Sequence, residues 1–164
     1  MDIADQFTQV INENKGLILK VCSLYTYKMD DRDDLYQEIV YQLWKSFDSY
    51  KGNAKLSTWM YRVAMNTAIF YLKKEQREIR TIPIESNLLQ LAEDFNQRED
   101  EKISQLYHYI QKLSLLERGI ILLYLESKSH EEIAEVMGMS TTNVGTRLSR
   151  IREKLKVQIT KIKE

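Results

Sequence analysis

The sequence predicts an all-α protein of two small helical domains joined by a flexible acidic linker. Helix-breaking residues are scarce, with five glycines and one proline among 164 residues, whereas leucine, isoleucine, lysine and glutamate are common. Apolar residues recur at helical spacing in both the first and the last part of the chain. Between these parts, residues 81–103 contain the only proline and much of the acidic charge. We therefore assign residues 1–80 to the first domain, 81–103 to the linker and 104–164 to the second domain.

The first domain is predicted to be a series of amphipathic helices. Its first 25 residues carry apolar side chains at helical spacing: Phe7, Val10, Ile11, Ile18, Val21, Leu24 and Tyr25. The carboxylates of DDRDD (30–34) favour the N-terminus of a following helix. The apolar stripe of that helix consists of Leu35, Ile39, Leu43 and Phe47. Residues 48–57 contain Gly52 and Asn53 and predict a loop. Ser57 is placed to cap a further helix over residues 58–78.

The second domain is predicted to end in two helices separated by a tight turn. Apolar periodicity resumes over residues 103–113. Ser129 and Glu132 have the S-x-x-E spacing of a capping box, which opens the first of the two helices. Gly138 can take the left-handed conformation that ends it, and Ser140 can cap the next helix. The apolar stripe of that last helix consists of Val144, Leu148, Ile151 and Leu155.

A helix, a tight turn with glycine and a second helix form the helix-turn-helix arrangement, whose second helix lies in the major groove of DNA. Polar side chains lie on a different face from the apolar stripe: Asn143, Thr146, Arg147 and Arg150. Arginine and asparagine suit this face because they pair bidentately with guanine and adenine edges. Near the phosphates, where contacts fix register, we expect Arg152, Lys154 and Lys156. A plain helical hairpin with a solvated basic face remains the alternative.

The net charge of zero conceals two basic blocks. Residues 51–84 and residues 137–164 each carry seven basic and two acidic side chains, and the other segments are acidic. Such asymmetry points to nucleic acid as the partner of the basic blocks. In the first block basic and aromatic side chains are interleaved, as in proteins that hold single strands. Core packing is the alternative for the aromatic residues. It is favoured for Phe70, and both interpretations stay open for Trp59 and Arg62.

Several classes of function are not expected. Cys22 is the single cysteine, so we expect a buried inert thiol and neither a disulfide framework nor a cysteine metal cluster. His108 and His130 have no partner at ligand spacing. The longest apolar run, residues 120–125, is too short to span a bilayer, and MDIADQF lacks the features of a signal peptide. We expect a cytoplasmic protein that is not an enzyme, with no cofactor, no metal and no membrane insertion.

Two segments resemble a known family. DLYQEIVYQLWKSFDSYKGNAKLSTWMYRVAMNTA (34–68) resembles region 2 of the extracytoplasmic-function (ECF) sigma factors of bacterial RNA polymerase. LSLLERGIILLYLESKSHEEIAEVMGMSTTNVGTRLSRIREKL (113–155) is similar to region 4 of the same family. The two segments cover about half of the chain and occur in the family's order and spacing, with a linker between them.

The resemblance implies three binding surfaces. The first docks on a coiled coil of the largest subunit of core RNA polymerase and comprises Asp34, Leu35, Gln37, Glu38 and Trp44. The second recognises and melts the −10 element of promoter DNA, holding an extruded base, and comprises Tyr50, Lys51, Gly52, Asn53, Ala54, Lys55, Trp59, Arg62 and Asn66. The third reads the −35 element and comprises Thr142, Asn143, Thr146, Arg147 and Arg150. The resemblance also allows for an anti-sigma factor as a further partner.

The sequence departs from the family pattern at three places. Ser114 stands where proline is usual, Ile69 and Phe70 occupy positions that are often polar, and Gly145 stands where some members carry arginine. The expected function is that of a sigma factor, which brings core RNA polymerase to a promoter and opens it. One alternative is a stand-alone helix-turn-helix regulator of duplex DNA. Another is a protein–protein adaptor with solvated basic faces.

Overall fold

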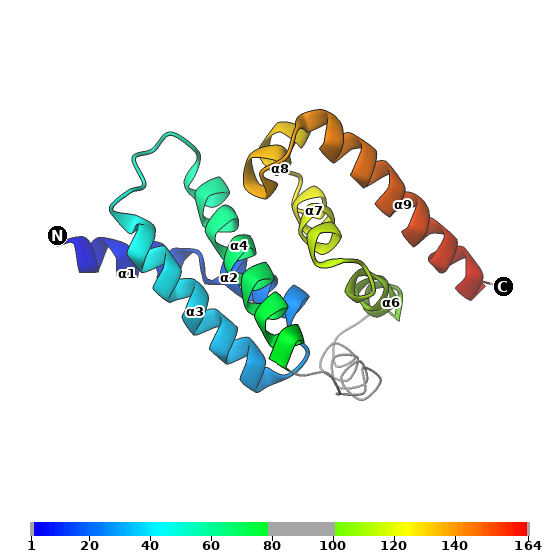
Figure 1. The fold of residues 1–164 in the computed structure, drawn as a ribbon, viewed down its shortest axis with the longest axis horizontal. Helices are drawn as coiled ribbons and strands as arrows, with labels where there is room; N and C mark the ends of the chain where they lie inside the picture. Colours follow the sequence, from blue (N-terminus) through cyan, green and yellow to red (C-terminus); the bar gives the residue numbers. More distant parts are fainter. Residues whose placement is uncertain (1, 79–100, 164) are drawn as a thin grey trace. The chain divides into compact units, whose positions relative to one another are not determined.

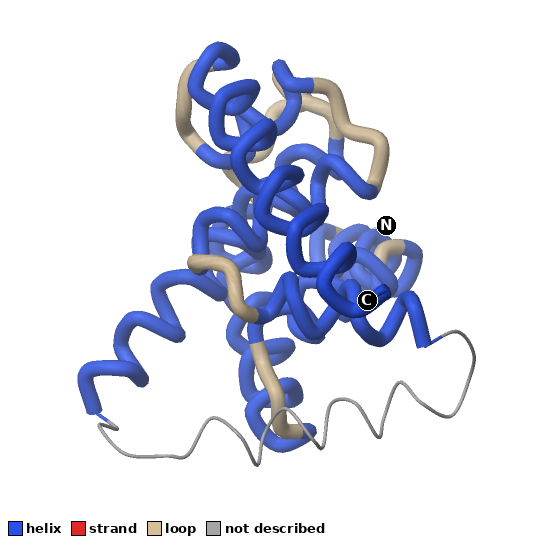
Figure 2. The backbone as a smooth tube through the Cα atoms, turned by 90° about the vertical axis from the view of Figure 1, so that its right-hand side faces the viewer, coloured by secondary structure: helices blue, strands red, loops and turns tan. Residues whose placement is uncertain are grey.

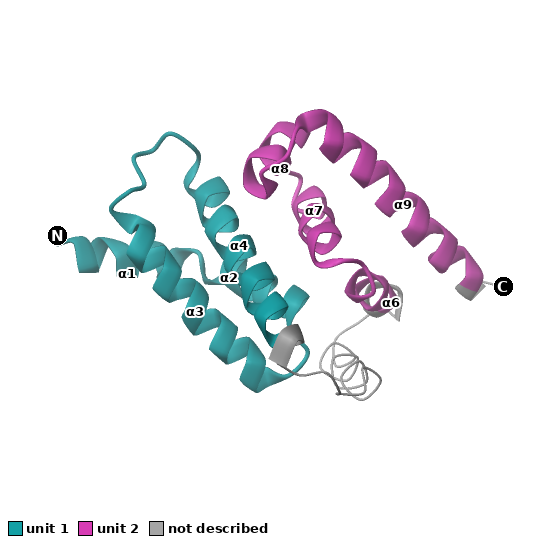
Figure 3. Ribbon diagram, in the orientation of Figure 1, with its two compact units in different colours: residues 1–78 teal, residues 79–164 magenta. Residues whose placement is uncertain are grey.

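The computed structural model describes residues 2–78 and 101–163, and this part of the chain is built from helices and loops without a strand (Figure 1, Figure 2). The chain divides into two compact units, residues 1–78 and residues 79–164 (Figure 3). The prediction of an all-α fold with two helical domains is confirmed. Residues 81–100 of the predicted linker lie outside the described residues, and the exact domain boundaries stay predictions.

Unit 1 is organised around a pair of long helices. Its helices are α1 (Ile3–Glu13), α2 (Lys15–Tyr25), α3 (Met29–Phe47) and α4 (Leu56–Glu78). The two long helices, α3 and α4, pack side by side, and α2 packs against both (Figure 1). Three members of the predicted stripe of α3, Leu35, Ile39 and Leu43, are fully enclosed, and its fourth member, Phe47, is half-buried. On α4 the buried side includes Ala64 and Ala68, whose small side chains let neighbouring helices approach closely.

The N-terminal apolar periodicity is divided between α1 and α2 at Asn14. The Asn14 side chain donates from Nδ2 to the Val10 carbonyl oxygen at 2.8 Å, and its backbone N–H donates to the Ile11 carbonyl oxygen at 3.2 Å. Local bonds of this kind compete with the continuation of a helix, which is why asparagine favours helix ends. At the other end, Asp2 caps α1 by accepting the Asp5 N–H at 2.8 Å.

The start of α4 differs from the prediction. The helix begins at Leu56, so the expectation that Ser57 caps it is wrong, and Ser57 is the second residue of the helix. The Trp59 N–H donates to the Lys55 carbonyl oxygen at 3.0 Å, and this bond begins the helical ladder two residues earlier than expected. Lys55 therefore lies where the loop meets the helix.

Unit 2 consists, in its described part, of α6 (Glu101–Gln111), α7 (Leu115–Leu125), α8 (His130–Met137) and α9 (Thr141–Lys163). The first of these overlaps the segment assigned to the linker by three residues, a difference of the size by which helix ends vary. The predicted stripe of α9 is confirmed as buried, and it shares a core with side chains of the other three helices. This stripe consists of Val144, Leu148, Ile151 and Leu155.

Serine side chains cap the helices of unit 2. At α7 the capping box is complete: Ser114 Oγ accepts the Glu117 N–H at 3.2 Å, and Glu117 Oε1 accepts the Ser114 N–H at 3.3 Å. The box predicted at α8 is present only in part. Ser129 Oγ accepts the Glu132 N–H at 3.1 Å, which is the first bond of the box. The Glu132 carboxylate, however, accepts from the Ser129 hydroxyl, at 3.2 Å. Ser114, which replaces the usual proline, thus supplies a side-chain cap that proline lacks.

The turn between α8 and α9 has the predicted chemistry. Gly138 ends α8 in the left-handed conformation with φ of 69°, and its N–H donates to the Ala134 carbonyl oxygen at 2.9 Å. Ser140 Oγ accepts the Asn143 N–H at 3.1 Å and caps α9. Gly145 lies inside α9, where an added Cβ would approach His130 only to an ordinary contact distance of 3.8 Å.

Alanine at the two glycines should change stability in opposite directions. Gly138→Ala places a side chain in the left-handed region and should lower the free energy of unfolding by about 1 kcal/mol. Gly145→Ala should raise it by about 0.5–1 kcal/mol, because alanine loses less backbone entropy in a helix and the site has room for a methyl group. Urea denaturation of the full chain, followed by circular dichroism, measures both changes. A change of the same sign in both variants would contradict this description of the turn.

Candidate nucleic-acid interface

The outward side of α3 carries three of the five residues expected to dock on the polymerase. Asp34, Gln37 and Trp44 are exposed, and Glu38 is half-buried on the side that faces α4. Leu35 is 0% exposed, so the expectation that it contacts a partner directly is corrected. Its side chain belongs to the buried stripe, and it acts by fixing α3 to the core of unit 1.

Tyr41 is the residue of this side that the sequence reasoning missed. It is 53% exposed and lies between Gln37 and Trp44, one turn from each, so helical spacing could have found it. Lys45 Nζ lies 5.4 Å from the centroid of the Tyr41 ring, a cation–π contact. An apolar hollow of about 360 Å³ opens beside this ring. It is lined by Phe7, Tyr36, Gln37, Val40, Tyr41 and Trp44.

The loop between α3 and α4 is held in shape by Tyr50. The Tyr50 and Trp59 rings stack with centroids 4.8 Å apart and planes inclined by 27°, and the Tyr50 hydroxyl donates to the Ala54 carbonyl oxygen at 2.6 Å. Gly52 has φ of 77°, a conformation that residues with side chains rarely adopt. The loop residues predicted to bind DNA that are exposed are Lys51, Gly52, Asn53 and Lys55. The Tyr50 side chain at the start of the loop thus binds Ala54 near the loop's end, and the residues between Tyr50 and Ala54 are exposed.

Trp59 combines the two interpretations that the sequence left open. One of its faces is covered by Tyr50, and the Phe47 ring lies at a centroid distance of 6.3 Å, so Trp59 is half-buried within unit 1. It also borders the loop that it helps to hold. Its packing role is therefore established by its contacts, and its role in DNA binding stays a prediction.

The outward side of α4 is basic, polar and aromatic. The exposed side chains among residues 56–75 are Arg62, Asn66, Phe70, Lys73 and Lys74. None of these five is acidic, which suits a helix that follows a phosphate backbone. Phe70 is 73% exposed, so the favoured interpretation of this residue as part of the core is wrong. It follows Asn66 by one helical turn and therefore continues the polar side rather than the buried one.

The outward side of α9 presents the residues expected to read duplex DNA. Thr142, Thr146 and Arg150 are exposed, and Asn143 and Arg147 are half-buried. Arg147 donates from Nε to Asn143 Oδ1 at 3.2 Å, so two predicted base readers support one another along the helix. The Thr146 hydroxyl donates to the Thr142 carbonyl oxygen at 3.1 Å. With its apolar stripe buried, α9 offers hydroxyl, amide and guanidinium groups on one surface.

Two of the three basic residues expected near phosphates also contact α7. Lys154 Nζ donates to Glu117 Oε2 at 3.0 Å, and the Arg152 guanidinium lies 5.5 Å from the centroid of the Tyr124 ring. Burial raises the pKa of Glu117, but the bonds from Lys154 and Ser114 outweigh it and hold that pKa below its usual value. These contacts tie α9 to α7, whereas Lys156 is exposed.

The residues that could form a reactive or metal-binding site are either buried or not grouped together. Cys22 is fully buried, and burial raises the pKa of its thiol to about 12, which is typical of an unreactive cysteine. Burial is the main cause that lowers the pKa of His108, and the positive charge of Lys112 lowers it further. Within the described residues no three histidine, cysteine or acidic side chains are grouped as a metal would need. No helix in those same ranges has the length and apolar character to cross a membrane.

Comparison with known proteins finds matches in both units. Residues 10–78 match Sigma-70 region 2, and residues 103–155 match Sigma-70 region 4. The ECF RNA polymerase sigma-E factor of Haemophilus influenzae is 32% identical over 157 residues, which span 85% of this chain and 82% of that protein. The chain belongs to the ECF family of RNA polymerase sigma factors. It is a sigma factor that directs transcription initiation, as the sequence predicted.

Other sigma factors extend the likeness over nearly the whole chain. The RNA polymerase sigma factor SigV of Bacillus subtilis is 28% identical over 154 residues, covering 92% of this chain and 89% of SigV. The sigma factor RpoE, solved with the anti-sigma factor NepR from Bartonella quintana, has a TM-score of 0.72 at 20% identity, covering 94% of this chain and 97% of that one. CnrH, solved with the cytosolic domain of CnrY, has a TM-score of 0.65 at 21% identity, with coverage of 94% and 87%. The two structures support the fold.

Tyr50→Phe should loosen the loop of this sigma factor while keeping the stack on Trp59. Loss of the hydroxyl that donates to Ala54 should lower the free energy of unfolding by about 0.5–1.5 kcal/mol and speed amide exchange in residues 51–55. Tyr41→Phe is the matched control, because the Tyr41 hydroxyl belongs to an exposed ring outside the loop. Urea denaturation and hydrogen exchange followed by mass spectrometry measure the two effects. Equal exchange in both variants would show that the loop does not depend on this bond.

Proposed function

We propose that this sigma factor docks on core RNA polymerase through α3, opens and holds the −10 element through the loop and α4, and reads the −35 element through α9. One observation supports this assignment most strongly. A single chain carries two surfaces of the kind that bind DNA: the outward side of α4, which is basic and aromatic, and the helix-turn-helix of α8 and α9. A stand-alone regulator of duplex DNA needs only the second surface and usually a second copy of it.

The docking surface on α3 combines acidic, amide and aromatic groups. Asp34, Gln37, Glu38 and Trp44 lie along α3, and we add Tyr41 because it lies one helical turn from Gln37 and from Trp44 and is exposed. Carboxylates complement a basic helical partner such as the proposed coiled coil of the largest polymerase subunit. An aromatic side chain beside an apolar hollow is the kind of group that contributes most to the free energy of binding.

The −10 surface consists of the preorganised loop between α3 and α4 and of α4, which follows it. Extruding a base from duplex DNA costs a few kcal/mol, and a loop that needs no further ordering leaves more binding free energy to offset this cost. The Tyr50 bond to Ala54 and the stack on Trp59 provide that order. We assign Lys51, Gly52, Asn53, Ala54 and Lys55 to the base and its flanking phosphates, and Arg62 and Asn66 to the strand along α4.

The −35 surface consists of the exposed start of α9. We assign base reading to the residues of its polar side, namely Thr142, Asn143, Thr146, Arg147 and Arg150. The Arg147 bond to Asn143 orients the guanidinium before DNA arrives, so fewer rotamers have to be fixed on binding.

We further propose that the protein acts in the cytoplasm, where the polymerase and promoter DNA meet, and that it is not itself an enzyme. Core RNA polymerase and promoter DNA are the proposed partners, with no cofactor and no metal. An anti-sigma factor is the remaining partner class, because the similar structures of RpoE and CnrH contain NepR and CnrY. An adaptor with solvated basic faces would show little salt dependence on DNA, whereas the proposed function requires a steep one.

Glu38→Arg and Tyr41→Ala should each weaken binding to core RNA polymerase by about tenfold or more, through charge reversal and loss of an aromatic anchor. Fluorescence anisotropy of the labelled full chain, titrated with core enzyme, measures the affinity. Glu13→Arg makes the same charge change at an exposed position of α1 and should bind like the wild type. If both variants bind normally, α3 is not the docking surface. If the wild type does not bind core enzyme but binds duplex DNA in a salt-sensitive way, the stand-alone regulator is the better account.

Arg150→Ala should weaken binding of the holoenzyme to a −35 duplex by about 5- to 150-fold and relax base preference at one position. Lys112→Ala removes one exposed positive charge outside α9 and serves as the control. Electrophoretic mobility shift of a duplex series with single base changes measures both affinity and preference. A uniform loss across all sequences would assign Arg150 to a phosphate instead of a base.

A further inference from the structure

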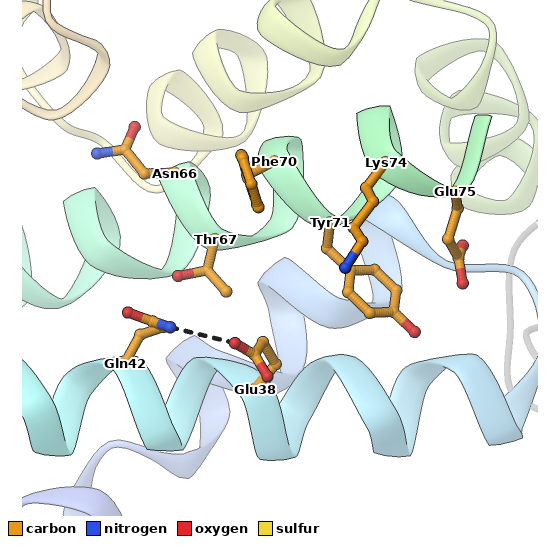
Figure 4. A pocket seen from close by; sticks show the side chains of 8 residues that line it. All are labelled: Glu38, Gln42, Asn66, Thr67, Phe70, Tyr71, Lys74 and Glu75. Carbon is orange, nitrogen blue, oxygen red and sulfur yellow. Dashed lines mark hydrogen bonds between the residues drawn. The ribbon is translucent and has the colours of Figure 1, made fainter. Parts of the chain in front are cut away.

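The hollow between α3 and α4 is lined in part by Glu38 and Asn66, which the proposed function already uses, but the hollow itself has no ligand assigned to it. It has a volume of about 590 Å³ and is lined by side chains of these two helices (Figure 4). Gln42 projects from α3 and Thr67 from α4 toward each other, and Asn66, Phe70 and Lys74 follow along α4. The hollow therefore lies along the outward side of α4, which carries Arg62, Lys73 and Lys74.

We propose that this hollow is a second nucleobase site, in which one base of the unwound promoter strand stacks on Phe70 while the amides of Gln42 and Asn66 bind its edge. This inference rests on the proposed function, because it requires α4 to follow the unwound strand. The ligand class is a base of single-stranded DNA, and the site is separate from the loop held by Tyr50.

Phe70 is the feature that points to a base. It is 73% exposed, and its neighbours on the outward side of α4 are cations and an amide rather than apolar groups. An exposed aromatic ring among cations is the arrangement by which proteins hold single strands, because every base offers a π face and every phosphate a charge. A protein partner with an apolar surface would instead meet Lys73 and Lys74 without a counter-charge.

The charges around the hollow separate the base from its phosphates. Glu38, Glu75 and Lys74 all line the hollow, but the two carboxylates are half-buried whereas Lys74 is exposed, as is Lys73 next to it. A phosphate is therefore repelled from the interior and attracted to the rim. Gln42 donates from Nε2 to Glu38 Oε1 at 3.1 Å. This bond turns the side-chain carbonyl oxygen of Gln42 away from Glu38 and leaves it able to accept a hydrogen bond. An acceptor of this kind can bind either an exocyclic amino group or the ring N–H of thymine or guanine, so it suits the edge of an extruded base.

The spacing allows one strand to reach both sites. Phe70 follows Trp59 by eleven positions on α4, about 16 Å at the helical rise. At about 3.4 Å per stacked step, this distance corresponds to roughly five nucleotides. The base at Phe70 is therefore a different base from the one assigned to the loop, and both fit within one unwound segment.

A double-mutant cycle on the holoenzyme tests the site. The probe is a fork-junction DNA whose single-stranded segment is first selected from a random pool by the wild-type holoenzyme, and in which an abasic nucleotide then replaces each position in turn. Phe70→Ala and Phe70→Trp are compared with Leu19→Ala, which truncates another exposed apolar side chain of unit 1 outside α4. Circular dichroism checks that each variant folds.

Phe70→Ala should weaken binding to the intact probe by about 5- to 150-fold, Phe70→Trp should bind like the wild type, and Leu19→Ala should have no effect. With the abasic nucleotide at one particular position, the wild type and Phe70→Ala should bind equally. The proposal is overturned if Phe70→Ala binds the intact probe normally, or if its loss is the same with every abasic probe. If the wild-type holoenzyme selects no fork-junction DNA at all, the proposed function itself fails.

Discussion

The packing of α3 against α4 is the contact on which the rest of unit 1 depends. Each helix uses one side for this contact, with Leu35, Ile39 and Leu43 enclosed on α3 and the small Ala64 and Ala68 on the buried side of α4. The opposite sides are left for partners, acidic and aromatic on α3, basic and aromatic on α4. The same contact fixes the two ends of the connecting loop, so that a tyrosine at its start can reach a tryptophan and a carbonyl at its end. A weaker pairing of the helices would disturb the docking surface, the loop and the hollow together.

Unit 2 is built on the same principle, because one side of α9 is buried in the core and the other side is left for a partner. Its stripe on α9 is buried, its turn is set by a glycine with positive φ and a serine cap, and its polar side presents groups that pair with base edges. Lys154 and Arg152 contact α7 and so help to hold α9 in place. In the proposed function, duplex reading and single-strand holding belong to separate units, because a rigid helix suits the major groove whereas a preorganised loop and a lined hollow suit extruded bases.

Short-range rules predicted much of this architecture, and tertiary contacts account for most of the differences. The stripe of α9, the left-handed Gly138 and the Ser140 cap each depend on residues within about one helical turn, so the sequence was sufficient to predict them. The stack of Tyr50 on Trp59 joins residues across a loop, which no local pattern reveals. Leu35 was placed on the docking surface by a motif whose apolar member serves the core. Phe70 was assigned to the core because it is apolar, although its spacing from Asn66 already placed it on the polar side.

The central claim is that one chain directs core RNA polymerase to a promoter and opens it there. Run-off transcription from fragmented genomic DNA, with permanganate probing of unpaired thymines, tests that claim most directly. The account predicts transcripts from discrete sites only when the protein is added to core enzyme, with unpaired thymines near each start and none when the protein acts alone. Binding of the protein to duplex DNA without new starts or unpaired thymines in the presence of core enzyme would contradict it.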